Sequence, residues 1–390
     1  MKLFKEKLAW AAPIAVILII ALFSVNLFAQ ANPQVKNLPI ALIVNDEGQH
    51  VDRVLEAVKA MSKGDQGSEA MLAFTSEEEE NIEALFADKE YYAALVIPAD
   101  YNATLQNVLA THQPAKLQIY INQGLNVTGS NFAKTALNGF ISSLNEEYSE
   151  TLIAQLDHEN ISAQQASIIV NPIVPEERVF NPITASTANG SAPTLLAVSA
   201  WVGALIGGFI LFLAASKRFE RATLTRKQTF TLISSQFVFG IIIALFSGFT
   251  VATLAQIAGI NMPSYFLVAF FVSFAAFCFY LLVSAITAWI GKPAITLFMV
   301  VMLLGMGVLM TPPEMLPSFF VNFIRPWVPI RFASEGLREI FYFGSGFYTG
   351  ASFNTILGIG IAGLIILVLS IFKPIKGNTL VTPVSVENQR

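Results

Sequence analysis

Six long apolar segments, none interrupted by Asp, Glu, Lys or Arg, constrain the fold of this 390-residue chain more than any other feature. A helix needs about 20 apolar residues to cross the hydrocarbon core of a bilayer. The segments that qualify are approximately 8–28, 194–215, 229–258, 264–290, 294–310 and 351–372. Only 13% of the residues are charged, against about 25% in an average soluble domain. These features exclude a purely soluble protein, a disordered tail and a nucleic-acid-binding protein.

Charge is divided unevenly along the chain. Residues 30–190 hold 21 of the 27 acidic and 8 of the 23 basic residues, a net −13, which leaves +9 for the rest. The basic residues that flank the spans are Lys2, Lys5, Lys7, Lys217, Arg218, Arg221, Arg226, Lys227, Lys292, Lys373 and Lys376. Six spans would place all of them on one side, and an excess of Lys and Arg marks the cytoplasmic side. We therefore expect a multi-pass cell-membrane (plasma or inner membrane) protein with both termini in the cytoplasm.

The predicted fold class is an α-helical polytopic membrane protein of six spans, with an α/β extracytoplasmic domain inserted between spans 1 and 2. The expected divisions are an anchor span at 1–29, the external domain at 30–193, a five-span membrane domain at 194–373 and a cytoplasmic tail at 374–390. Cleavage after Ala31 is the alternative for the N-terminus, because Ala29-Gln30-Ala31 resembles a signal-peptide site. The apolar run before it is longer than the usual 7–15 residues, which favours an uncleaved anchor.

The segment 311–350 is too polar to span a bilayer and too apolar for an ordinary loop. We expect short interfacial or re-entrant helices there, on the outer face, with aromatic side chains at the depth of the lipid headgroups. Glu335 and Arg338 share one helical face, which predicts a local ion pair. The candidate residues of this segment are Pro317, Pro326, Trp327, Pro329, Glu335, Arg338 and Glu339.

The external domain alternates predicted strands and helices. Strands are expected at 38–44, 92–98 and 116–122, and helices at 49–62, 100–110 and 130–157. Ser76 and Glu79 are spaced as a capping box, which predicts a further helix beginning at Ser76. A cation site at Glu77–Glu80 is the alternative to a solvated helix start. Prolines within 171–183 predict an extended connector into the second span.

Apolar residues recur every four positions along 130–157, from Phe132 to Leu156. At 1.5 Å per residue this stripe is about 40 Å long. It would pack on the small sheet or, alternatively, contact a second copy or another partner outside the membrane.

The sequence predicts no catalytic, cofactor-binding or metal site. It contains no GxxxxGK[ST] loop and no HExxH, Cys278 is its single cysteine, and its three histidines are scattered. Ion-coupled carriers usually need an ionisable group within the bilayer, whereas these spans offer neutral polar residues. The candidate polar path is Ser234, Ser235, Gln236, Thr250 and Gln256. Hydrogen bonding between helices is the alternative role. A path of this kind suits an amphipathic solute, with energy supplied from outside the chain.

Three stretches carry a resemblance to a known family: 38–48 (LPIALIVNDEG), 192–208 with Ala200-Trp201-Val202-Gly203, and 314–340 with Glu314-Met-Leu-Pro317 and Pro326-Trp327-Val-Pro329. With one anchor span, a large external domain and a five-span block, the chain resembles the phage-infection-protein (Pip) family within the ABC type-2 transporter permeases. In that group, a segment such as 311–350 forms short re-entrant helices before the last span.

The resemblance implies a permease subunit that exports a hydrophobic or amphipathic substrate such as a drug, lipid or envelope component. It also implies a homodimer, or a heterodimer with a related permease, and a separate ABC ATPase that binds the ATP. The candidate ATPase-contact loop contains Lys217, Arg218, Glu220, Arg221, Arg226 and Lys227, which are also explained as an orientation signal. A non-transporting envelope protein, acting as phage receptor, secretion-apparatus component or scaffold, is the alternative function.

Overall fold

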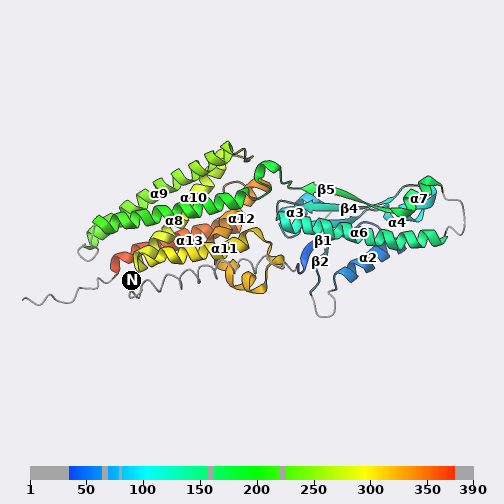
Figure 1. Ribbon diagram of the computed structural model, residues 1–390, viewed down its shortest axis with the longest axis horizontal. Helices are drawn as coiled ribbons and strands as arrows, with labels where there is room; N and C mark the ends of the chain where they lie inside the picture. Colours follow the sequence, from blue (N-terminus) through cyan, green and yellow to red (C-terminus); the bar gives the residue numbers. More distant parts are fainter. Residues whose placement is uncertain (1–34, 64–68, 79–80, 156–161, 219–224, 374–390) are drawn as a thin grey trace, which may run out of the picture.

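The computed structural model describes residues 35–63, 69–78, 81–155, 162–218 and 225–373. They form a bundle of long helices with an α/β domain at one end (Figure 1). The predicted anchor span at 8–28, the cleavage site at Ala31 and the tail at 374–390 lie outside the described residues.

Five described helices are long and apolar enough to cross a membrane. They are α8 (Ala192–Arg218), α9 (Arg226–Ile257), α10 (Tyr265–Ile290), α11 (Pro293–Met310) and α13 (Gly350–Leu369), which the 3₁₀ turn η7 (Ser370–Phe372) extends. Each coincides with a segment predicted from its lack of charge. The prediction of spans 2 to 6 is therefore confirmed as five membrane-capable helices.

Helix α10 forms the centre of the bundle. Two thirds of its most apolar stretch is buried (67%), against 39% or less for the other four helices. Trp201 of α8 is fully buried and meets Phe279 of α10 edge to face at 5.2 Å between ring centroids. On α9, the small residues Gly240 and Gly248 lie against Tyr280 and Ser273 of α10. Small residues let neighbouring helices approach closely, which membrane helices use in place of a hydrophobic driving force.

The α/β domain contains one five-stranded sheet in the order β2-β1-β3-β4-β5. The strands are β1 (Leu38–Val44), β2 (Leu72–Ser76), β3 (Ala93–Ile97), β4 (Ala115–Asn122) and β5 (Ile173–Phe180). All neighbours are parallel except β3 and β4. The three predicted strands correspond to β1, β3 and β4, whereas the two edge strands, β2 and β5, were not predicted.

Both edge strands correct a prediction. Ser76 ends β2 instead of capping a helix, and the next helix begins after Asn81, whose side chain accepts hydrogen bonds from the backbone of Glu83 and Ala84. The proline-containing connector is extended but pairs regularly with β4. Pro175 is tolerated because β5 is an edge strand, where a missing N–H need not break the sheet.

Helices cover the sheet and fill its connections: α2 (Gln49–Met61), α3 (Ile82–Ala87), α4 (Tyr101–Gln106), α5 (Val108–Thr111), α6 (Val127–Gln155) and α7 (Ala163–Val170). The stripe of α6 packs into the domain core, where Leu137, Ile141 and Leu144 are buried. In the described part of α6, the apolar stripe therefore packs on the sheet. Leu156, the last residue of the predicted stripe, lies outside the described residues.

The chain alternates direction through the bundle (Figure 1). At the end next to the α/β domain, Asn261 N–H donates to Ser186 O at 2.8 Å, within the turn η2 (Ala185–Thr187). At the opposite end, Arg226 lies over the Phe372 ring and Lys373 Nζ donates to Trp289 O at 2.5 Å. The basic residues next to α9, α11 and α13 therefore gather at the end farthest from the domain.

Candidate functional site at the domain junction

The segment between α11 and α13 folds into short helices beside the α/β domain. They are η4 (Pro313–Met315), the π-helical turn η5 (Phe320–Ile324), η6 (Arg325–Trp327) and α12 (Pro329–Tyr342). Pro317 lies between η4 and η5, Pro326 lies within η6, and Pro329 begins α12. Proline suits a first helical position because the N–H it lacks would have no partner there.

Helix α12 has one apolar and one charged face. Ile330, Ala333, Leu337 and Ile340 are buried in the same core as α8 and α13. Gly336 lies so close to Phe271 that an added Cβ would overlap the ring. This packing fixes the helix and directs its charged residues toward the α/β domain.

Glu335 is the centre of a charged cluster on this face. Its Oε1 lies 3.1 Å from Arg325 Nη2 and 3.6 Å from Arg331 Nη1. Glu335 therefore pairs with Arg325 and Arg331, and not with Arg338 as the helical spacing predicted. Arg338 Nη1 instead donates to the backbone carbonyl of Leu125 at 3.0 Å, because the domain brings that carbonyl to the end of the Arg338 side chain.

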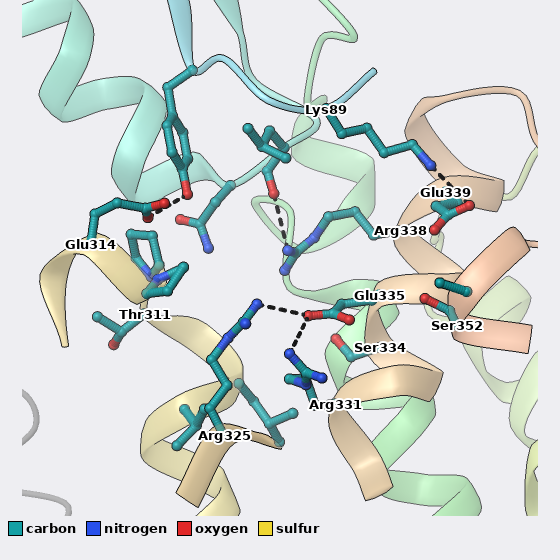
Figure 2. Close-up of a pocket in the computed structure, with 18 of the residues that line it drawn as sticks. Lys89, Thr311, Glu314, Arg325, Arg331, Ser334, Glu335, Arg338, Glu339 and Ser352 are labelled. Carbon is teal, nitrogen blue, oxygen red and sulfur yellow. Dashed lines mark hydrogen bonds and ion pairs between the residues drawn. The ribbon is translucent and has the colours of Figure 1, made fainter. Parts of the chain in front are cut away.

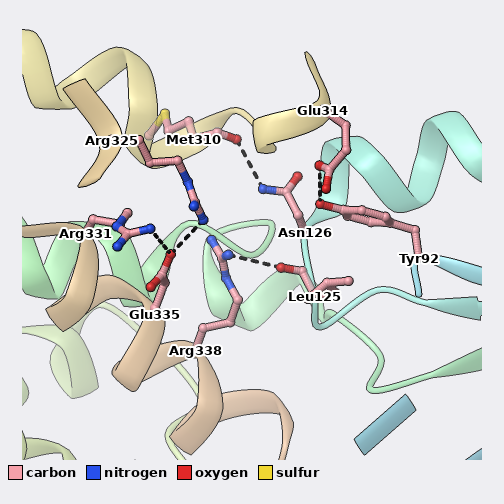
Figure 3. Close-up of polar contacts among 9 residues, drawn as sticks. All are labelled: Tyr92, Leu125, Asn126, Met310, Glu314, Arg325, Arg331, Glu335 and Arg338. Carbon is pink, nitrogen blue, oxygen red and sulfur yellow. Dashed lines mark hydrogen bonds and ion pairs between the residues drawn. The ribbon is translucent and has the colours of Figure 1, made fainter. Parts of the chain in front are cut away.

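Several contacts join this segment to the α/β domain (Figure 3). Tyr92 Oη donates to Glu314 Oε2 at 2.8 Å, and Asn126 Nδ2 donates to Met310 O at 3.4 Å. Lys89 Nζ lies 2.9 Å from Glu339 Oε2. The domain is thus tied to both ends of the segment between α11 and α13.

Burial sets the protonation behaviour of the junction. It is the main cause that raises the pKa of Tyr92 well above its usual value, followed by the charge of Glu314. Tyr92 therefore remains a hydroxyl donor to Glu314. Burial also lowers the pKa values of Arg331 and Arg338, because water no longer solvates their charges fully.

A cavity of about 360 Å³ lies within these residues. The guanidinium groups of Arg325, Arg331 and Arg338 point toward the same space around Glu335 (Figure 2). Local sequence gives no sign that Lys89, Tyr92, Leu125 or Asn126 belong to this site, since they join it only through the fold. Arg325, Arg331 and Arg338 are the residues of this site that the sequence could have suggested, because they are charged residues within an apolar half of the chain.

A second pocket, of about 510 Å³, lies between α9 and α10 and is almost wholly apolar. Five phenylalanines line it: Phe266, Phe270, Phe274, Phe277 and Phe347. Ser273 is the polar residue among those lining it. The pocket can accept an apolar group from the surface of the bundle.

The predicted polar path lies mainly on the outer surface of α9. Ser234, Ser235, Thr250 and Gln256 are exposed, and Gln236 is half-buried. Helix α9 turns its small residues toward α10, which leaves these polar residues on its other faces. Ser235 Oγ donates to Thr231 O at 2.8 Å, a bond within the same helix.

The predicted ATPase-contact loop is described only in part. Lys217 and Arg218 end α8, while Arg226 and Lys227 begin α9, where Thr225 and Gln228 form a capping box. Glu220 and Arg221 lie outside the described residues. The end of α8 and the start of α9 lie at the end of the bundle opposite the α/β domain (Figure 1).

Comparison with known families decides the class of protein. A model of the ABC-2 family transporter proteins matches residues 9–372, which is nearly the whole chain. The chain belongs to this family. ABC-2 permeases are membrane components of transporters that pair with an ABC ATPase, so this chain is a multi-pass membrane protein of the transport class.

Other comparisons add little to the ABC-2 assignment. No curated protein matches significantly. A crystal structure of a domain ascribed to an ABC type-2 transporter from Thermotoga maritima MSB8 is 16% identical, with a TM-score of 0.26. The match covers 36% of this chain and 86% of that one. This likeness is too distant to support an argument.

Proposed function

We propose that this chain is the membrane-spanning subunit of an ABC-type exporter for a hydrophobic or amphipathic substrate. Membership of the ABC-2 family over residues 9–372 carries the proposal. ATP is bound and hydrolysed by a separate ATPase. The resemblance of 38–48, 192–208 and 314–340 to the Pip family supports placement in that branch.

The proposed topology has six spans, with the N-terminus and the tail at 374–390 in the cytoplasm. Arg226, Lys292 and Lys373 stand at the ends of α9, α11 and η7. Figure 1 shows these helix ends opposite the α/β domain, which supports the topology because cytoplasmic ends are rich in Lys and Arg. Residues 30–193 are then extracytoplasmic, residues 1–29 form the anchor, and 194–373 form the five-span block.

In this arrangement the loop from Lys217 to Lys227 contacts the ATPase. Two permease chains associate, and the exposed face of α9 supports this step. That face carries Val238, Ile242 and Phe246 beside the polar residues Ser234 and Gln256. A path between two copies would be both apolar and polar, as an amphipathic substrate requires.

The apolar pocket between α9 and α10 supports the choice of substrate class. Its lining, rich in phenylalanine, suits a hydrocarbon or aromatic group and includes no charged residue that would bind an inorganic ion.

A pull-down of the intact protein in mild detergent tests the proposal. We expect an ABC ATPase to be recovered with it, and the recovered complex to move a tail-labelled amphipathic substrate across proteoliposomes only when ATP is present. Recovery of envelope proteins without an ATPase, and no ATP-dependent movement, would contradict the exporter and favour an envelope scaffold.

A further inference from the structure

The junction cavity, a partly open hollow lined by charged side chains, is the strongest candidate for a further binding site. Its walls come from the loop before β3, the turn after β4, the turn after α11, and α12 (Figure 2). Its volume of about 360 Å³ falls within the range of small-molecule sites. Leu125, Val308 and Leu309 supply apolar wall beside the charged groups.

Positive charge dominates the middle of this cavity, although its lining as a whole carries equal numbers of basic and acidic residues. Lys89 and Glu339 neutralise each other at 2.9 Å, Glu90 is exposed, and Glu314 is held by the hydroxyl of Tyr92. In the centre, three guanidinium groups face the single carboxylate of Glu335. Those groups belong to Arg325, Arg331 and Arg338.

These arginines are incompletely satisfied. Nε of Arg331 is buried and has no hydrogen-bond partner among the described residues. Among the described residues, the hydrogen bond that Arg338 donates goes to an uncharged group, the backbone carbonyl of Leu125. Burial lowers the pKa values of both, as expected for cations that have lost water without gaining a full set of anionic partners. Such groups gain most from a further anion.

We propose that the junction cavity binds a phosphate-bearing anion, with the guanidinium groups of Arg325, Arg331 and Arg338 as donors. A guanidinium presents paired N–H groups that match two oxygens of one phosphate, and several of them suit a tetrahedral anion. The ligand is an anionic lipid headgroup or a free phosphate, which share this chemistry.

Neighbouring residues favour the lipid as the source. Phe319, Phe323 and Trp327, on the segment that carries Arg325, are all exposed. Exposed aromatic residues collect at the depth of lipid headgroups. A headgroup in the cavity would leave its acyl chains beside these rings. The role in transport rests on the proposed function, because the cavity would then hold the headgroup of the exported substrate.

Binding to the full-length protein in detergent tests this site without the ATPase. The probes are tail-labelled phosphatidylglycerol and, as the zwitterionic comparison, tail-labelled phosphatidylcholine. We expect wild-type protein to prefer phosphatidylglycerol, and Arg331→Gln and Arg338→Gln each to weaken that binding at least about tenfold, as for loss of one charge-assisted hydrogen bond. Arg178→Gln is the control, since Arg178 is exposed on β5 and pairs with Glu176.

The variant Glu335→Gln distinguishes loss of a competing anion from damage to the fold. If the Glu335 carboxylate competes with the ligand, its removal should strengthen phosphatidylglycerol binding severalfold. If Glu335 only holds the site together, its removal should weaken that binding. Inorganic phosphate that competes with the lipid identifies free phosphate as a ligand, and failure to compete assigns the site to the headgroup. Equal binding of both lipids by wild type, or equal losses in Arg178→Gln and Arg331→Gln, would overturn the proposal. Because no ATP is used, absence of transport would leave these binding results unchanged.

Discussion

Gly248 determines how closely α9 can approach α10. A Cβ added there would overlap Ser273 and the backbone carbonyl of Ala269. A backbone atom cannot move aside as a side chain can, so the helices must separate. Gly240, two turns earlier, makes the same kind of approach to Tyr280.

Replacing Gly248 by Ala should therefore destabilise the protein by about 1–3 kcal/mol, the usual cost of overpacking. Thermal unfolding in detergent measures it. Gly358→Ala on α13 is the matched control, because nothing lies within 4 Å of its added Cβ. Equal unfolding temperatures for the two variants would show that the α9–α10 contact is not tight.

His50 gives the α/β domain a dependence on pH. Burial, and then the nearby charge of Arg53, lower its pKa from 6.5. Its Nδ1 lies 3.2 Å from Tyr148 Oη. The unfolded chain then binds more protons than the folded one as the pH falls below 6.5, so folding stability decreases on that side.

His50→Gln should reduce this loss of stability at acidic pH while leaving stability above pH 6.5 less affected. Unfolding temperatures measured across the acidic pH range give the slope of stability against pH for wild type and for the variant. A variant whose slope equals that of wild type would assign the pH dependence to other groups.

At the residue scale, sequence reveals charges but not their partners. Glu335 and Arg338 were singled out from the sequence, yet the residues that they contact in the structure were not predicted. Tyr92 and Glu314 are 222 positions apart, and Leu125 and Arg338 are 213 apart. Helical spacing predicts contacts between neighbours in sequence and carries no information about pairs that only the fold brings together.

At the scale of elements, α12 is the piece that couples the two parts of the molecule. Its apolar face belongs to the bundle, and its charged face meets the domain. The ion pair between Lys89 and Glu339 joins the turn after α3 to α12, and the two side chains are partly shielded from water, at 33% and 16% exposure. We expect it to be stronger than a fully exposed pair, because screening by solvent is weaker there.

Lys89→Glu should loosen this joint, and the double variant Lys89→Glu/Glu339→Lys should restore it. We expect a coupling energy of about 1 kcal/mol in a double-mutant cycle of unfolding measurements. The exposed pair Lys36–Glu69, exchanged in the same way, is the control and should show less. An absence of coupling between Lys89 and Glu339 would mean that the pair is incidental.

Elements were predictable where one physical signal dominated. Uninterrupted apolar sequence located α8 to α11 and α13, because no charge can lie within a span without large cost. Strand β2 was missed because it is five residues long and its last residue, Ser76, precedes acids that imitate a helix start. Strand β5 was missed because Pro175 and the charged residues after it are typical of loops and tolerated at a sheet edge.

At the scale of the whole molecule, positive charge gathers at one end of the bundle and the acidic domain occupies the other (Figure 1). If the basic end receives the ATPase, Arg218→Glu with Arg221→Glu should reduce ATPase recovery in the pull-down by about tenfold or more, as for loss of two charged contacts. Lys134→Glu with Arg178→Glu on the domain is the matched control. Equal recovery from both double variants would show that the loop serves orientation alone.

Helix α6 begins at Val127, immediately after Leu125 and Asn126, which are held by Arg338 and Met310. Its 29 residues give a rod about 44 Å long at 1.5 Å per residue. One end of the rod is thus anchored on the membrane bundle and the other lies at the far tip of the domain (Figure 1). Each degree of tilt about the anchored end would displace the tip by about 0.8 Å, by the geometry of a rod of that length. A movement of α12 too small to disturb the packing of the bundle would therefore be amplified into a displacement of several ångströms outside it.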